Sequence, residues 1–100
     1  MKKIYISGAI SGTSDFMERF AKAEKELTEQ GYSVVNPAKV NSMLPSDTTW
    51  EEYMQMSMTM LKMCDCIYML RGWANSKGAN REYAFAVTAD MEIMFVEVAE

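Results

Sequence analysis

Short apolar runs alternate with longer amphipathic segments along the whole chain. The apolar runs are rich in β-branched and aromatic residues, which favour strands, and they cover Lys3–Ser7, Tyr32–Asn36, Cys66–Leu70 and Glu92–Val98. In the segments between them, apolar residues recur at helical spacing. The predicted order is therefore βαβαβαβ, which indicates parallel strands joined by right-handed crossovers.

This order predicts a three-layer α/β fold. We expect a flavodoxin-like parallel sheet of four strands, in the order 2-1-3-4, with helices on both faces. One hundred residues suffice for one core but not for a separate substrate domain. Residues 1–100 are therefore expected to form a single domain.

The first helix has an apolar face at helical spacing, made by Phe16, Phe20, Ala23 and Leu27. Thr13 or Ser14 can cap its start, and Gly31 ends it. Pro37 cannot donate to a strand ladder, so it should close the second strand and begin an irregular segment that lasts to Thr48.

The next helix begins with a capping box at Thr49–Glu52 and is expected to run to about Cys64. Its inner arc comprises Trp50, Tyr53, Met54, Ser57, Met58, Leu61 and Cys64. Met56, Met60 and Met63 continue the apolar surface around one side. Two interpretations fit this stripe: a contact within a homodimer or higher homo-oligomer, or adaptable core packing in a chain rich in methionine.

Composition excludes several classes of protein. The net charge is −4 and no Lys/Arg cluster occurs, which argues against binding a nucleic-acid polymer along its phosphates. No apolar run approaches the roughly 20 residues of a membrane span, and the start moves straight into a strand rather than a signal sequence. We therefore expect a cytoplasmic protein without a membrane partner.

The two cysteines, Cys64 and Cys66, are separated by one residue and the chain has no His. Without a second cysteine pair or a His, a zinc site is not expected. We predict two reduced, buried thiols, and no metal or cofactor.

Glu82 is the candidate chemical group, because helical spacing aims it inward. Its neighbours on that face are Gly78, Ala79, Phe85, Ala86 and Ala89, whereas the opposite face carries Asn80, Arg81 and Thr88. An acid among apolar residues must be hydrogen-bonded or paired, and desolvation raises its pKa. The alternative is that Glu82 pairs with Arg71, Lys77 or a backbone amide and has no chemical role.

A ligand site is expected beyond the carboxyl ends of the first and third strands, where the strand order reverses. The loops there, Gly8–Thr13 and Arg71–Gly78, are rich in glycine and serine. The helix beginning near Ser76 offers free N–H groups to an anion, although the first loop lacks the Gly-Lys-Ser/Thr ending of a P-loop. With Tyr5 and Trp73 nearby to face a planar base, the site suits a nucleoside or nucleotide, with chemistry at its anomeric carbon.

These residues resemble a known family. The chain is similar to the small nucleoside 2-deoxyribosyltransferase-like proteins of the DUF4406 group over almost its whole length. The similarity lies in Ile4–Gly12, Val35–Ala38, Trp50–Met54, Cys64–Tyr68, and Gly72-Trp73 with Ser76, Gly78-Ala79 and Glu82.

The resemblance implies roles for individual residues. Glu82 would be the nucleophile that holds the deoxyribosyl group, and Asp65 would fix the sugar or the nucleophile. Substrate contacts are expected at Tyr5, Ser7, Gly8, Ile10, Gly12, Gly72, Trp73, Ser76 and Gly78. Ser76 stands where related deoxynucleotide N-glycosidases place a serine that meets the 5′-phosphate, which favours a nucleotide. Asp65 has an equally good interpretation as a residue that satisfies backbone amides at a strand start.

One departure from the family leaves the function open. Ser57 stands where many relatives carry an aspartate, and a hydroxyl cannot supply the same proton to a leaving base. The first hypothesis is an N-glycosidase or deoxyribosyltransferase acting on a 2′-deoxynucleoside or its 5′-monophosphate. The second is a nucleotide-binding module without turnover, and the third is an interaction subunit that uses the methionine stripe.

Overall fold

The computed structural model describes residues 2–10 and 12–96. Its strands are all parallel and lie in the order β2-β1-β3-β4. Their bounds are β1 Lys3–Ser7, β2 Ser33–Val35, β3 Cys66–Met69 and β4 Glu92–Phe95. This confirms the predicted sheet, although β2 and β3 are shorter than expected, and residues 97–98 of the expected last strand lie outside the described part of the chain.

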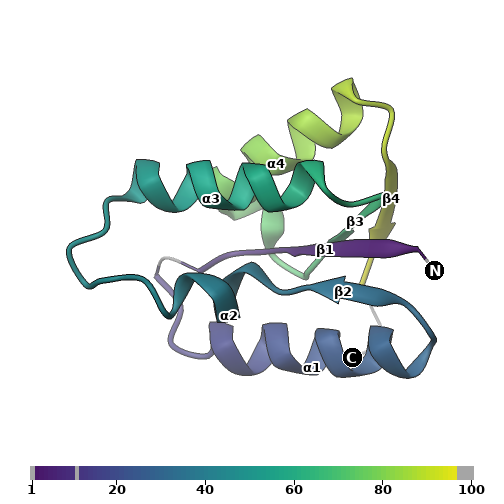
Figure 1. Cartoon of the computed structure of the whole chain (residues 1–100), viewed down its shortest axis with the longest axis horizontal. Helices are drawn as coiled ribbons and strands as arrows, with labels where there is room; N and C mark the ends of the chain where they lie inside the picture. Colours follow the sequence, from purple (N-terminus) through teal and green to yellow (C-terminus); the bar gives the residue numbers. More distant parts are fainter. Residues whose placement is uncertain (1, 11, 97–100) are drawn as a thin grey trace.

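Helices cover both faces of the sheet (Figure 1). The helices α1 (Phe16–Glu29) and α2 (Pro37–Asn41) lie on one side, and α3 (Trp50–Lys62) and α4 (Lys77–Thr88) lie on the other. The three-layer flavodoxin-like architecture is therefore confirmed. No helix in the described residues is both long and apolar enough to cross a membrane.

Alternation along the strands divides the core into two halves. Ile4 and Ile6 pack toward α1, whereas Tyr5 and Ile67 pack toward α3 and α4. Successive strand residues point to opposite faces, and β1 is the central strand, so its side chains are buried on both sides. The polar group of Tyr5 is thereby placed inside the α3/α4 half.

Helix α1 begins one residue later than its predicted caps. Asp15 is its N-cap and makes no side-chain capping bond, while the Thr13 hydroxyl donates to the Ile10 carbonyl instead. The predicted end is confirmed, because Gly31 adopts a left-handed φ of +96°. The amides of Gly31 and Tyr32 reach back to α1 carbonyls in the pattern of a Schellman motif.

The expectation of an irregular segment from Pro37 to Thr48 is wrong for its first part, because α2 forms over Pro37–Asn41, whereas residues 42–48 contain no helix or strand. The Asn36 side chain accepts a hydrogen bond from the Lys39 amide at 3.2 Å, and Pro37 occupies the first turn, where its missing N–H costs nothing. Asn36 also donates to Glu24 of α1 at 3.0 Å. This cap and tether hold α2 against the body of the protein.

The capping box of α3 is confirmed in both directions. The Glu52 amide donates to the Thr49 hydroxyl at 3.1 Å, and the Thr49 amide donates to the Glu52 carboxylate at 2.9 Å. The helix ends at Lys62, slightly before the expected Cys64. The methionine stripe is not continuous, since Met60 is buried in the core while Met56 and Met63 are exposed.

Candidate functional site

A cavity of about 270 Å³ lies at the carboxyl end of β1 and is lined by residues of α1, α2, α3 and α4. Each wall comes from a segment that follows a strand or from helix α3. The lining residues include Tyr5, Gly8, Ile10, Phe16, Pro37, Asn41, Trp50, Tyr53, Met54, Ser57, Ser76, Gly78 and Glu82. This is the edge at which open parallel sheets bind ligands.

Glu82 lies on α4 at the floor of this cavity and is 6% exposed. The Tyr5 hydroxyl donates to its Oε2 at 2.5 Å, and the Ser7 hydroxyl donates to its Oε1 at 2.6 Å. Tyr5 and Ser7 are both on β1 and, two residues apart, point to the same face of the sheet. Each carboxylate oxygen is therefore held by one hydroxyl and keeps lone-pair capacity for a ligand.

The carboxyl group of Glu82 has its pKa raised from 4.5 to about 7. Burial is the largest cause, and the hydrogen bonds from Ser7 and Tyr5 oppose it by stabilising the charged form. Burial also raises the pKa of Tyr5 well above 10, with the nearby charge of Glu82 acting in the same direction. Tyr5 therefore keeps its proton and remains a hydrogen-bond donor.

Among the contacts of residues 2–10 and 12–96, Glu82 is held by hydroxyl groups and by no Lys77 or backbone-amide partner. The ion pairs within residues 2–10 and 12–96 join Lys2 to Glu92 and Lys39 to Glu24. The hydrogen-bond partners of the Glu82 carboxylate are the two hydroxyls of β1. The carboxyl group of Glu82 is therefore held by neutral donors, and with a pKa of about 7 its ionised form becomes the major one only above that pH.

A second polar group lies beside the first. The Asn41 side chain donates from Nδ2 to the Ser57 hydroxyl oxygen at 3.2 Å, and both residues are buried. Ser57 also lowers the pKa of Tyr5, against the larger effect of burial. Two buried polar pairs therefore belong to this cavity, Asn41–Ser57 between α2 and α3 and Tyr5–Glu82 between β1 and α4.

The start of α4 lies at the same cavity. The Ser76 hydroxyl accepts from the Ala79 amide at 3.1 Å, which leaves the amides of Lys77 and Gly78 without partners inside the helix. Lys77 and Arg81 place their charged groups 4.7 Å and 5.3 Å from the centre of the Trp50 ring. Ser76 and Gly78 line the cavity, whereas Lys77 and Arg81 are exposed and contact one of its wall residues, Trp50.

Gly78 permits close packing of α4 on α3. A Cβ at this position would lie 3.2 Å from the sulfur of Met54. A side chain at this position would require the Met54 side chain to shift by a few tenths of an ångström. The prediction that Gly78 belongs to the site agrees with its place in the cavity wall.

Comparison with known proteins identifies the family. Residues 2–95 match the family described as a domain of unknown function (DUF4406). The chain belongs to this family. This confirms the resemblance inferred from the sequence motifs.

A solved structure shows the same fold. A 2-deoxyribosyltransferase from the psychrotolerant bacterium Bacillus psychrosaccharolyticus is similar to this DUF4406 protein with a TM-score of 0.75 and 16% sequence identity. The match covers 93% of this chain and 70% of the other. No curated protein matches the sequence.

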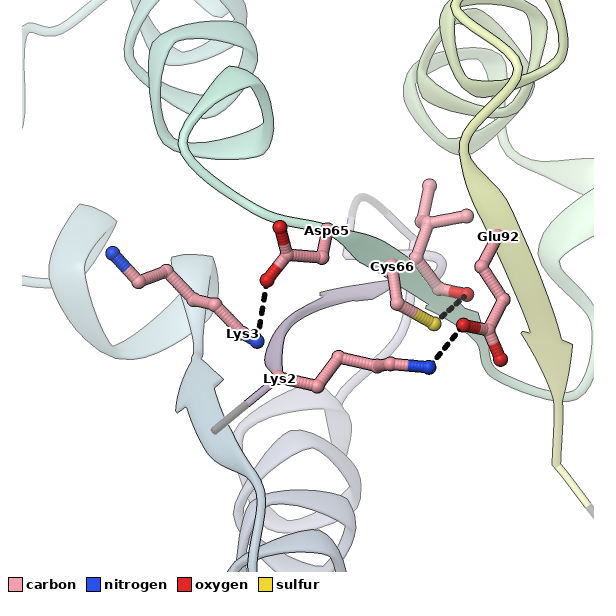
Figure 2. A network of polar contacts seen from close by, with 6 residues as sticks. Lys2, Lys3, Asp65, Cys66 and Glu92 are labelled. Carbon is pink, nitrogen blue, oxygen red and sulfur yellow. Dashed lines mark hydrogen bonds and ion pairs between the residues drawn. The ribbon is translucent and has the colours of Figure 1, made fainter.

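Asp65, one of the two predicted catalytic residues, lies away from the cavity. It is exposed at the amino end of β3, and its Oδ2 accepts from the Lys3 amide at 3.0 Å (Figure 2). The Asp65 amide donates to the Lys3 carbonyl at 2.8 Å. All four strands are parallel, so their amino ends face away from the site, and the interpretation of Asp65 as a residue that satisfies a backbone amide is the one the structure supports.

Four predicted substrate contacts also lie outside the cavity lining. Ser7 is one of them, although its hydroxyl holds Glu82. Gly12 is exposed and left-handed, and Gly72 caps a short 3-10 helix (Trp73–Asn75) with a φ of +83°. The Trp73 ring packs against Tyr83, with ring centres 4.6 Å apart, so it is a packing residue of the α4 side. Of the residues expected around Glu82, Ala89 follows the end of α4 and is exposed.

Sequence reasoning missed most of the wall made by α2 and the start of α3. Asn41, Tyr53 and Trp50 line the cavity but were not predicted as site residues. The pair Asn36-Pro37 is the signal for α2, since an N-cap asparagine before a proline at the first helical position is a recognised start. Nothing local in the sequence indicates that this helix folds over β1.

Burial of the two cysteines agrees with the prediction. Cys64 and Cys66 are free and buried. Burial raises the pKa of each thiol to about 11. Both are therefore protonated packing residues.

Proposed function

We propose that this protein is an N-glycosidase or deoxyribosyltransferase that acts on a 2′-deoxynucleoside 5′-monophosphate or the corresponding nucleoside, with Glu82 as nucleophile. One observation carries the proposal: a buried carboxylate at a cavity floor, with both oxygens positioned by the Tyr5 and Ser7 hydroxyls. The fold shared with a 2-deoxyribosyltransferase is consistent with it.

The reaction has two steps. In the first, an ionised Glu82 oxygen forms a bond to C1′ of the deoxyribose while the bond from C1′ to the base nitrogen breaks, and the base leaves with the bonding electrons. The carboxylate stabilises the positive charge that develops at C1′. In the second step, water or another base attacks C1′ and releases Glu82, giving hydrolysis or transfer respectively.

The leaving base has no acid to protonate it from this cavity wall. Glu82 is the one carboxyl group among the described lining residues, and Ser57 is a hydroxyl that accepts from Asn41. We infer that the base takes its proton from water after or during departure. This predicts slow turnover relative to an enzyme with a positioned general acid.

A 5′-monophosphate suits the cavity better than an uncharged nucleoside. The free amides at the start of α4, the Ser76 hydroxyl, and the cations Lys77 and Arg81 can all interact with a phosphate. Ser76 and Gly78 line the same cavity as Glu82, and the two cations lie over the ring of Trp50, another lining residue. The sugar of a bound nucleotide would lie between the phosphate and the base.

The test is release of free base from each 2′-deoxynucleoside and each 5′-monophosphate, followed by chromatography. Wild-type protein should release base, and Glu82→Ala should lose at least about a thousandfold in rate, because the nucleophile is gone. Glu51→Gln, an exposed acid at the start of α3, is the matched control. Equal release by wild type and Glu82→Ala would remove Glu82 from the mechanism.

The second candidate is a nucleotide-binding module that does not turn over its ligand. It is favoured by Ser57, because a hydroxyl stands where a proton donor to the base would be needed. Thermal stabilisation by a 2′-deoxynucleotide without any base release over a long incubation would support it. Base release that depends on Glu82 would exclude it.

A further inference from the structure

The carboxylate of Glu82 is held at both of its oxygens by residues of one strand. The Tyr5 hydroxyl donates to Oε2 at 2.5 Å, and the Ser7 hydroxyl donates to Oε1 at 2.6 Å. The last torsion of a glutamate side chain is broad and roughly two-fold, so a single hydrogen bond would leave the plane of the carboxylate free to turn. Two donors on the two oxygens fix that plane.

Ser7 differs from Tyr5 in its place relative to the cavity. Tyr5 lines the cavity, whereas Ser7 is 1% exposed and is not among the lining residues. Its hydroxyl donates to Oε1 of Glu82, which occupies the single hydrogen that a serine hydroxyl can donate. Ser7 can therefore act on a ligand in the cavity only through Glu82.

The support of Ser7 is rigid. Ser7 is the last residue of β1, a central strand, and its carbonyl accepts from the Leu70 amide at 2.8 Å. A Cβ added to the next residue, Gly8, would lie 3.0 Å from the Leu70 side chain, so the chain packs closely at this end of β1. A donor on such a support can hold its acceptor in one position.

We infer that Ser7 is a positioning residue for the nucleophile: its hydroxyl, which lies outside the cavity lining, fixes the plane of the Glu82 carboxylate and favours its ionised form. The carboxylate is thereby aligned for attack on C1′ of a bound substrate. The inference rests on the proposed function and adds a residue to it. It also replaces the direct contact with substrate that the family resemblance implies for Ser7.

The hydrogen bond from Ser7 also bears on the charge of Glu82. Burial raises the pKa of Glu82 to about 7, and the bonds from Ser7 and then Tyr5 oppose that effect. Tyr5 and Tyr53 are the other titratable residues of the described lining, and β3 faces this side with apolar residues. Lys77 and Arg81 are exposed outside the lining. Glu82 is therefore the acid whose ionisation a change at Ser7 should alter.

The first test follows that ionisation without any reaction. Carbon-13 NMR of protein labelled at the glutamate carboxyl groups gives the titration midpoint of Glu82, whose signal is the one missing from Glu82→Gln. Ser7→Ala removes a hydrogen bond to the charged form and should raise the midpoint by about one pH unit. The matched control is Thr88→Ala, which removes an exposed hydroxyl of the same helix that donates to the Ala84 carbonyl. It should leave the midpoint unchanged.

The second test separates positioning from ionisation, using release of base from the 2′-deoxynucleoside 5′-monophosphate that wild type cleaves fastest. At about pH 9, Glu82 is ionised in both proteins, yet Ser7→Ala should still lose about tenfold in kcat because the carboxylate plane can turn. KM should stay within about twofold, since Ser7 does not meet the substrate. Ser7→Thr keeps the hydroxyl and should restore kcat to within about threefold of wild type.

The decisive variant, Ser7→Ala, removes one oxygen atom and adds no bulk to the core. An unchanged midpoint in this variant would overturn the inference and leave the proposed function standing. Full recovery of kcat at pH 9, or a rise in KM in place of the fall in kcat, would do the same. If wild type releases no base, the proposed function and the positioning role are both overturned, and a raised midpoint would then show a hydrogen bond without chemistry.

Discussion

The two ends of the sheet carry acids in opposite circumstances. At the carboxyl end, Glu82 is buried and held by two hydroxyls of β1. At the amino end, Asp65 is exposed and bound to the Lys3 amide, and Glu92 pairs with Lys2 at the surface (Figure 2). The difference teaches that residue type alone does not identify a site, because parallel strands expose their ends to two unrelated environments.

Each environment has its own energetic consequence. Burial opposes the charge of Glu82 and raises its pKa to about 7. Water screens the charges at the amino end, where ion pairs contribute little. A buried carboxylate whose ionised form is opposed by desolvation can react with a ligand in the cavity. A solvated carboxylate such as Asp65 instead accepts a hydrogen bond from the local backbone.

The largest expected effect is on the pH dependence of base release. Only ionised Glu82 can attack C1′, so the rate should rise by about fiftyfold between pH 5 and pH 7 and level off above pH 8. Asp65→Asn should leave this profile unchanged. The measurement is the initial rate across pH, corrected for uncatalysed release, and a flat profile over this range would contradict a nucleophile with this pKa.

The second effect concerns stability. The folded-state pKa of Glu82 lies above its unfolded value, so the folded protein holds a proton that the unfolded chain loses between about pH 4.5 and pH 7, and stability falls over that window. Glu82→Gln avoids this loss and should gain up to about 3 kcal/mol at pH 8, but close to nothing at pH 4.5. Urea unfolding of both proteins at the two pH values measures it. The same gain at both values would show that the charge of Glu82 is not the cause.

A smaller effect is expected at the amino end. Asp65→Ala removes the acceptor for the Lys3 amide and should cost about 1 kcal/mol of unfolding free energy, because that amide can turn to water. Base release at saturating substrate should stay within about twofold of wild type. If Asp65→Ala reduced the rate of base release as much as Glu82→Ala does, Asp65 would have to take part in the reaction.

Substitution of the exposed methionines of α3 should have the smallest effect on the unfolding free energy of the monomer. We propose that Met56 and Met63 contact a second copy of the chain, so sedimentation should show a homo-oligomer that Met56→Glu with Met63→Glu dissociates. Monomer stability should change by no more than about 0.5 kcal/mol, whereas Met60→Ala should cost about 2–4 kcal/mol through its cavity in the core. If wild-type protein is monomeric at high concentration, the proposed subunit contact is contradicted.

Local signals predicted much of the architecture. The capping box at Thr49 and Glu52 and the left-handed Gly31 both depend on residues a few positions apart. The short helix at Pro37 was missed although its cap is equally local, because the proline was interpreted only as a strand terminator. The sequence left open whether Met60 packs in the core or at a subunit contact, and its burial fits core packing. Apolar residues nearly encircle this helix, so periodicity does not separate core from surface.

The sequence by itself determined the parallel sheet, its strand order and the inward direction of Glu82, since these follow from periods of two and 3.6 residues and from the handedness of crossovers. Only the tertiary structure decided which groups meet that carboxylate. Tyr5 and Ser7 are more than seventy residues away along the chain, and Asn41 reaches the cavity only because α2 folds over the end of β1. Side-chain hydrogen bonds depend on distances of about 3 Å between distant segments, and those distances are set by the packing of the whole domain.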